Sequence, residues 1–173
     1  CTGMESFVWS YYGPREIGES AFENCTGLRY MKKYNTTGST DGVFELPTYV
    51  RVIGQDAFKN CFAPNIEAYL ALPSGVQTIG EYAFASDRIC QIVVGKTGSS
   101  WGGAYNDYCT SAFETGNDRL LVIFQNRTSY QDFLDNTHPS GVLKPCMTYP
   151  LTLKFEDTTA SPTQTTTEKK LNY

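Results

Sequence analysis

One recurring phrase limits what this chain can fold into. Ile-Gly-x-x-Ala-Phe occupies residues 17–22, 53–58 and 79–84, and a degenerate copy follows at 108–113. A second phrase, Leu-Pro-x-x-Val-x-x-Ile-Gly, begins at Leu46 and again at Leu72. Self-similarity at a period of roughly 25 residues is typical of repeat architectures, in which a unit buries its apolar side only against its neighbours. The sequence therefore predicts a solenoid.

Short apolar stretches separate the copies and predict its strands. Residues 89–94 are rich in Ile and Val, as short strands are. Pro47 and Pro73 stand where such strands should stop, because proline has no amide hydrogen to donate to a parallel ladder. Gly54 and Gly80 follow at a bend, where we expect a positive φ, which glycine adopts most easily.

Each repeated position suits one place in a rung of the solenoid. The Ile faces inward, the Ala allows one tight contact, and the Phe fills the core and stacks on the Phe of the next rung. The Cys that follows is expected to be a small buried hydrophobic group. These predicted structural positions are Ile17, Gly18, Ala21, Phe22, Cys25, Ile53, Gly54, Ala57, Phe58, Cys61, Ile79, Gly80, Ala83 and Phe84.

The pattern resembles the BspA-like, or Treponema pallidum type, class of leucine-rich repeats. The resemblance is closest at residues 46–61 and 72–84, and it extends over about residues 1–125. It implies a right-handed leucine-rich repeat solenoid, a β-rich α/β superhelix with short parallel β-strands and irregular or short helical returns. It also implies a secreted or cell-surface bacterial protein that acts in adhesion or host-protein binding.

Changes in composition predict the domain organisation. We expect residues 1–147 to form the repeat array, with a C-terminal cap at about 120–147, because solenoids need a covered end. Residues 148–173 are expected to be a linker or the first strand of a further C-terminal module, since an alternating stretch at 151–157 precedes a Thr-rich one. Because the chain begins inside a repeat, we expect a longer parent protein.

Function is expected where the repeat is interrupted, at the loops 34–43 and 95–108, because loops on a rigid scaffold vary without disturbing the core. The candidate ligand-binding residues are the aromatic residues Tyr30, Tyr34, Tyr69, Trp101 and Tyr105, with Trp9, Tyr11 and Tyr12 as further members. Tyr and Trp give a large contact area at low entropic cost. Core packing and ordinary surface exposure are the alternative for most of them.

Charge and residue types argue against several functions. A net charge of -4 and the absence of a concentrated Lys/Arg face disfavour nucleic acid and anionic membranes as partners. No apolar run approaches the roughly 20 residues of a membrane span. The only histidine, His138, lies in a turn-like segment, and the chain has no C-x-x-C pair, so we expect no catalytic residue, metal or other cofactor.

Some alternatives remain open at the level of sequence. Cys109 and Cys146 could form a disulfide, and Asn24, Asn35 and Asn126 begin N-x-[ST] sequons. The leading hypothesis is a non-enzymatic module that binds an extracellular or host protein through the solenoid face and its loops. The alternatives are a carbohydrate-binding accessory module of a secreted enzyme, which would bind a glycan, and a passive structural spacer.

Overall fold

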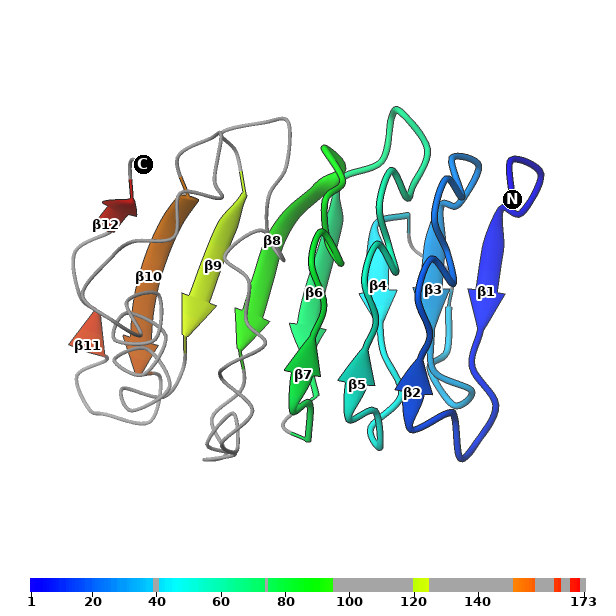
Figure 1. Cartoon of the computed structure of the whole chain (residues 1–173), viewed down its shortest axis with the longest axis horizontal. Helices are drawn as coiled ribbons and strands as arrows, with labels where there is room; N and C mark the ends of the chain where they lie inside the picture. The colour runs from blue at the N-terminus through cyan, green and yellow to red at the C-terminus, as the bar shows by residue number, and fades with distance from the viewer. Residues whose placement is uncertain are drawn as a thin grey trace.

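The structure, a computed structural model, describes residues 1–38, 41–73, 75–94, 120–124, 151–157, 164–165 and 169–171. Figure 1 shows a row of short strands that lie side by side along the molecule. The large sheet contains parallel strands in the order β1 (Ser6–Val8), β3 (Tyr30–Lys32), β4 (Val43–Glu45), β6 (Ala68–Leu72), β8 (Ile89–Val94), β9 (Leu121–Phe124) and β10 (Leu151–Asp157). The second sheet contains β2 (Glu16–Ile17), β5 (Val52–Ile53) and β7 (Thr78–Ile79), also parallel. The predicted parallel-strand solenoid is confirmed.

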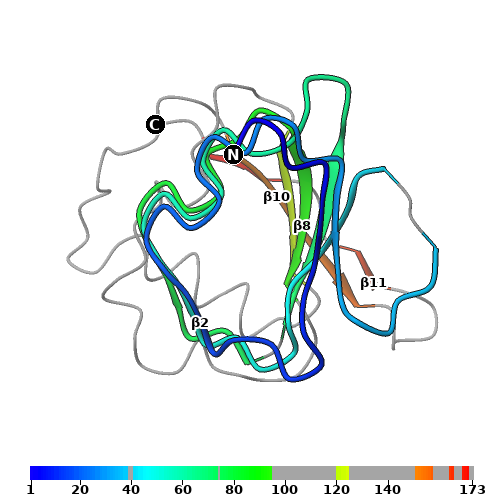
Figure 2. The ribbon, with the colours of Figure 1, turned by 90° about the vertical axis from the view of Figure 1, so that its right-hand side faces the viewer.

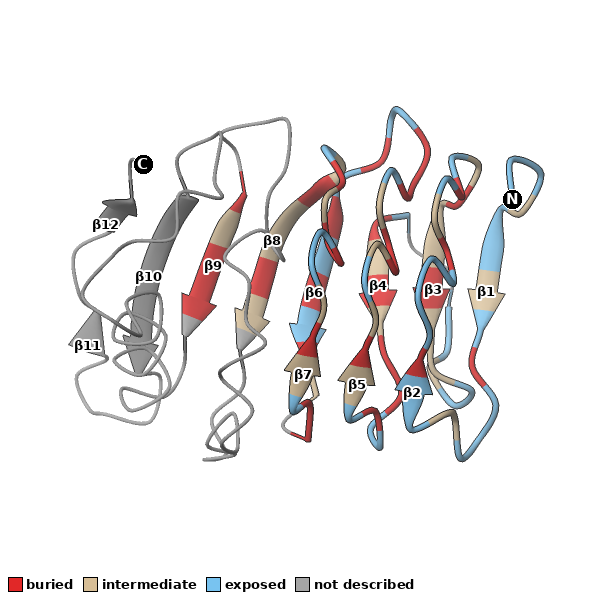
Figure 3. Cartoon of the chain, in the orientation of Figure 1, coloured by how far each residue is buried: buried red, intermediate tan, exposed pale blue. Residues whose placement is uncertain are grey.

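The core lies between the two sheets (Figure 3). β6 shows the alternation most clearly, because Ala68, Leu70 and Leu72 are buried whereas Tyr69 and Ala71 are exposed. Pro47 and Pro73 follow the large-sheet strands closely, as their missing amide hydrogen predicts.

The repeated phenylalanines form a stack through the core. The Phe58 ring lies 5.4 Å from the Phe22 ring and 5.7 Å from the Phe84 ring, and both pairs are nearly coplanar, with interplanar angles of 3° and 4°. Among the other repeated positions, Ile17, Ile53, Ile79, Cys25, Cys61, Ala57 and Ala83 are buried. Ala21 is exposed, because the rung that contains it is the first of the second sheet and has a neighbour on one side only.

The return path after each second-sheet strand consists of successive tight turns. Within the described residues these returns contain no helix, in contrast to the short helical returns considered above. Phe22 N donates to Ala57 O at 2.8 Å, and Phe58 N donates to Ala83 O at 2.8 Å. Backbone hydrogen bonds therefore join neighbouring rungs at the turns as well as in the sheets.

The expected positive φ at Gly54 and Gly80 is wrong. The positive φ falls two residues later, at Asp56 and Tyr82, both with φ 54. The glycines are needed for a different reason, since a Cβ at Gly80 would lie 2.4 Å from Gln55 N and one at Gly54 would lie 2.5 Å from Glu19 N. Close approach of adjacent rungs, rather than backbone conformation, thus favours glycine here.

One connection leaves the solenoid path. The chain passes from β1 to β3 through β2, and from β4 to β6 through β5, so both connections run behind the large sheet. Between β3 and β4 it instead bows out on the opposite side of that sheet (Figure 2). This connection, whose described residues are 33–38 and 41–42, is called the outer crossover below. It advances the chain to the next strand on the other face, so its hand is opposite to that of its neighbours.

The outer crossover changes how the repeat is counted. Residues 34–43 were expected to lengthen one unit, but β3 and β4 on its two sides are separate strands of the large sheet. β3 has no counterpart in the second sheet, where β2 pairs directly with β5. The long interval between the first two copies of the repeated phrase therefore contains one additional strand.

Trp9 supports the region around this additional strand. Its backbone N donates to Lys32 O at 2.9 Å, and its indole Nε1 donates to Glu45 O at 2.8 Å. The ring is 5% exposed and packs edge-on against Phe7 and Phe22. Trp9 therefore belongs to the core, and little of its side chain is accessible.

The C-terminal part of the chain adds strands to the large sheet. β10 pairs in parallel with β9, with Leu153 opposite Val122. β11 (Gln164–Thr165) and β12 (Lys169–Leu171) pair antiparallel with β10. The boundary at residue 147 and a further module after it stay predictions, and most of the expected cap lies outside the described residues. The described part contains no helix long and apolar enough to cross a membrane.

Candidate binding surface

The outward face of the large sheet presents side chains in rows. Strand register places Val43 opposite Tyr69, and Glu45 opposite Ala71. All four are at least partly accessible, while the intervening Phe44 and Leu70 point into the core and are buried. Parallel pairing thus fixes which outward side chains are neighbours.

Glu45 anchors the outer crossover to this face. Its Oε2 accepts a hydrogen bond from Lys33 N at 2.9 Å and another from the Thr36 hydroxyl at 2.7 Å. Hydrogen bonds to a charged acceptor are stronger than neutral ones. One carboxylate on β4 therefore holds the start of the crossover close to the sheet.

Basic side chains hold the rest of the crossover. Arg29 Nε donates to Asp41 Oδ1 at 3.1 Å, and Arg29 Nη2 donates to Asp41 Oδ2, which gives a two-pronged ion pair. The hydrogen bond to Asp41, followed by its charge, raises the pKa of Arg29. Lys32 Nζ donates to Gly38 O at 2.5 Å and lies 5.5 Å from the centre of the Tyr30 ring.

Gly42 ends the crossover at a position that other residues would not fit. Its φ is +82°, in the left-handed region, and a Cβ there would lie 2.1 Å from Glu67 O. Gly42 O also accepts a hydrogen bond from Tyr69 N at 3.0 Å. The chain can therefore enter β4 close against β6 only if this residue is glycine.

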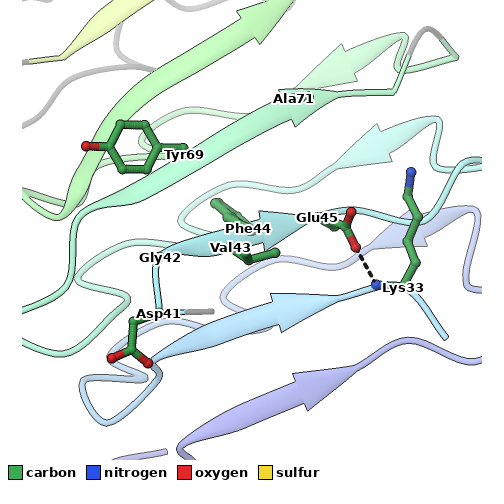
Figure 4. A pocket seen from close by; sticks show the side chains of 8 residues that line it. All are labelled: Lys33, Asp41, Gly42, Val43, Phe44, Glu45, Tyr69 and Ala71. Atoms are coloured by element: carbon green, nitrogen blue, oxygen red, sulfur yellow. Dashed lines mark hydrogen bonds between the residues drawn. The ribbon is translucent and has the colours of Figure 1, made fainter. Parts of the chain in front are cut away.

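A groove of about 510 Å³, called the sheet groove below, lies between the crossover and the outward face (Figure 4). Its lining residues are Lys33, Asp41, Gly42, Val43, Phe44, Glu45, Tyr69 and Ala71. Val43 and Ala71 are apolar positions of the sheet, while Lys33, Asp41 and Glu45 carry charge. The sheet groove thus combines an apolar floor with charged groups at its edge.

A second depression adjoins the sheet groove at Asp41 and Tyr69. Its volume is about 530 Å³, and its other lining residues are Pro64, Asn65, Ile66, Glu67, Asp87 and Arg88. The Tyr69 hydroxyl donates to Glu67 Oε2 at 3.0 Å, so the ring that separates the two depressions is held at both ends. Tyr69 is therefore shared by two adjoining hollows of this face.

The structure separates the predicted ligand-binding residues. Tyr69 is 50% exposed and lines the sheet groove, whereas Tyr30 is half-buried beneath Lys32. Tyr34 is 63% exposed and lies in the outer crossover, but in a different hollow from Tyr69. Trp101 and Tyr105 lie outside the described residues.

Sequence reasoning missed the residues that make the groove. Lys33, Asp41 and Glu45 are ordinary charged residues, and no motif distinguishes them. The available signal was the alternation in residues 43–45, which predicts that Val43 and Glu45 share one face. Nothing in the amino-acid sequence indicates that the outer crossover passes over that same face.

The described residues offer little for catalysis or metal binding. No group of three or more His, Cys, Asp or Glu side chains among them could hold a metal ion. Cys25 and Cys61 are buried free thiols, and burial, followed by the nearby Cys25, raises the pKa of Cys61 to about 12. A thiol with this pKa is a poor nucleophile near neutral pH. Cys109 and Cys146 lie outside the described residues.

The family model for the BspA type leucine-rich repeat region matches this chain in six copies, over residues 1–97 and 39–114. These residues include the strands of both sheets from β1 to β8 and the outer crossover. A comparison with curated proteins and a comparison with solved structures gave no match.

Proposed function

The chain belongs to the BspA-type leucine-rich repeat family, and on that premise we propose that it is a non-catalytic module that binds a protein partner through the outward face of its large sheet. Repeat families of this kind are generally non-catalytic and act in protein interactions. The repeats supply a rigid and extended surface, and the side chains that stand on it determine what binds.

The observation that carries the proposal is the sheet groove. Its floor rests on strands β4 and β6, so Val43, Tyr69 and Ala71 are fixed in position before any partner binds. Protein interfaces typically combine an apolar, aromatic centre with a polar rim. The exposed ring of Tyr69, with Asp41 and Glu45 near it, has this composition.

We further propose that the module works at a cell surface or after secretion, in adhesion to a host or matrix protein. Proteins of this family are commonly associated with the cell surface. Charged residues make up only 18% of the chain and it contains 12 tyrosines, a composition that suits contact with proteins outside the cell.

The test is a binding screen of the whole chain against a panel of purified extracellular-matrix and serum proteins by surface plasmon resonance. We expect at least one panel protein to bind, and Tyr69→Ala to weaken that binding by at least about tenfold, as loss of a central aromatic residue does. The matched control is Tyr82→Ala, because Tyr82 is 36% exposed and does not line the sheet groove.

Two results would contradict the proposal. One is equal binding by the wild type and Tyr69→Ala. The other is the absence of binding to any panel protein, which would favour the passive spacer.

A further inference from the structure

A second and smaller hollow lies at the edge of the large sheet where β1, β3 and β4 end. Its volume is about 170 Å³, and it is called the tyrosine hollow below. The lining residues are Trp9, Ser10, Tyr11, Lys33, Tyr34, Asn35, Pro47, Thr48 and Tyr49. They come from three segments that each follow one of these strands, and parallel strands bring those segments to the same edge.

The rings around this hollow are exposed yet held in place. Tyr11, Tyr34 and Tyr49 are 67%, 63% and 56% exposed. The Tyr11 ring packs edge-on against Tyr34, with ring centres 6.3 Å apart, and against Tyr12 at 5.0 Å. Rings this exposed contribute little to the stability of the fold. Their clustering is therefore better explained by contact with a ligand.

The polar groups of the hollow are available to a ligand. Within the described residues, the hydroxyls of Tyr11, Tyr34 and Tyr49 make no hydrogen bond, and neither do the side chains of Asn35 and Thr48. These groups can both donate and accept hydrogen bonds. The hollow thus offers ring faces and hydroxyl or amide groups side by side.

The lining excludes other classes of ligand. Its described residues include no Leu, Ile, Val or Met, so they do not supply the aliphatic surface that an acyl chain or an aliphatic peptide anchor would need. β3 and β4 are each paired on both sides and β1 on one side, so an extended peptide could add as a strand to β1 alone, and no residue of β1 lines the hollow. Lys33 is the one charged residue among the described residues of the lining, so these residues do not suit a strongly charged ligand.

We propose that the tyrosine hollow binds a pyranose unit of an oligosaccharide. A pyranose has a C–H face that packs on the negative face of an aromatic ring, and its rim of hydroxyls requires donors and acceptors nearby. At about 170 Å³ the hollow is smaller than the roughly 300 Å³ at which pockets for drug-sized ligands begin, which suits one sugar ring. The tyrosine hollow shares Lys33 with the sheet groove, but none of its aromatic residues lines that groove, and the proposal does not depend on the protein-binding proposal.

The experiment is a glycan array with the whole chain, followed by titration calorimetry with the strongest oligosaccharide. Tyr34→Ala is expected to weaken binding by at least about tenfold, or roughly 1.4 kcal/mol. Tyr34→Phe keeps the ring and should stay within about threefold of the wild type, because stacking supplies most of the contact. Tyr69→Ala, a matched exposed tyrosine in the sheet groove, should bind as the wild type does.

Thermal melting of each variant shows whether it remains folded, and the exposure of Tyr34 predicts that all of them do. An array without a bound glycan would overturn the proposal. So would a glycan whose affinity is unchanged in Tyr34→Ala, or one that Tyr69→Ala weakens equally. Because Tyr69→Ala is the test variant for the sheet groove and the control here, failure of one proposal can be told from failure of the other.

Discussion

Phe58 is the middle residue of the phenylalanine stack. It is fully buried, it stacks between Phe22 and Phe84, and the Phe44 ring packs edge-on against it at 4.9 Å. We expect Phe58→Ala to lower the free energy of unfolding by about 3–5 kcal/mol, because the neighbouring rings are held by their own rungs and cannot close the cavity. Urea denaturation measures this loss.

Phe22→Ala provides the comparison for Phe58→Ala. Phe22 is 8% exposed and stacks on one phenylalanine of the ladder rather than on two. Its replacement should therefore cost less than that of Phe58. Equal losses for the two variants would show that the stack does not stabilise the core in the way its geometry indicates.

The repeated glycines allow a test at one position of the repeat. A Cβ at Gly80 would lie 2.4 Å from Gln55 N, whereas a Cβ at Gly18 has no atom within 4 Å. We expect Gly80→Ala to destabilise the fold by about 1–3 kcal/mol, as overpacking does, and Gly18→Ala to change stability little. Thermal melts of the two variants measure the difference, and a similar shift in both would contradict close approach as the reason for glycine.

The Cys61 thiol predicts a dependence of stability on pH. Its pKa is raised from 9.0 to about 12 by burial, so unfolding lets the thiol release a proton between pH 9 and pH 12. The contribution of Cys61 to stability is therefore complete below pH 9 and declines above it, by up to about 1.4 kcal/mol per pH unit. Urea denaturation across this range should give a steeper decline for the wild type than for Cys61→Ala, and parallel curves would contradict this.

At the scale of elements, the outer crossover depends on one side chain for its attachment to β4. Glu45 accepts hydrogen bonds from Lys33 N and from the Thr36 hydroxyl. We expect Glu45→Ala to release this part of the crossover, so that trypsin cleaves after Lys33 at least about tenfold faster, because a local opening cost of roughly 1.5–3 kcal/mol per charged hydrogen bond is lost.

Glu45→Gln is the matched control, since its amide oxygen can accept both hydrogen bonds but carries no charge, which makes them weaker. Cleavage of this variant should fall between that of the wild type and that of Glu45→Ala. Unchanged cleavage in Glu45→Ala would show that the contacts of Arg29 with Asp41 and of Lys32 with Gly38 hold the crossover without Glu45.

The regular elements could be predicted from the sequence, whereas the outer crossover could not. Leu-Pro marks the ends of β4 and β6, and Ile-Gly marks β5 and β7, because each motif has the same physical role in both of these rungs. Residues 34–42 have the composition of an ordinary polar loop. Composition does not determine on which face of a sheet a loop crosses. The sheet groove could therefore not be predicted from the sequence either.

At the scale of the whole molecule, stability should depend on position along the array, because each rung is stabilised by its neighbours. Phe58 N and Asp56 N donate to the following rung, and Phe22 N and Asn24 N donate to theirs, so the rung of β5 is bonded on both sides. We expect hydrogen exchange of the whole chain to be slowest over residues 52–62 and faster over residues 1–15, since β1 is the edge strand of the large sheet. Uniform exchange over both segments would indicate that the array unfolds as one unit.

The length and sequence of the outer crossover can vary independently of the rungs, which set the spacing of the solenoid. In a solenoid, a residue inserted into a return path shifts every rung that follows, unless the insertion bulges away from the rung. The crossover lies outside that path and touches the sheet through a few polar contacts, so its length can change while β3 and β4 keep their register. Selection, or a protein engineer who grafts a binding peptide between Lys33 and Asp41, can therefore alter what this face recognises without rebuilding the solenoid.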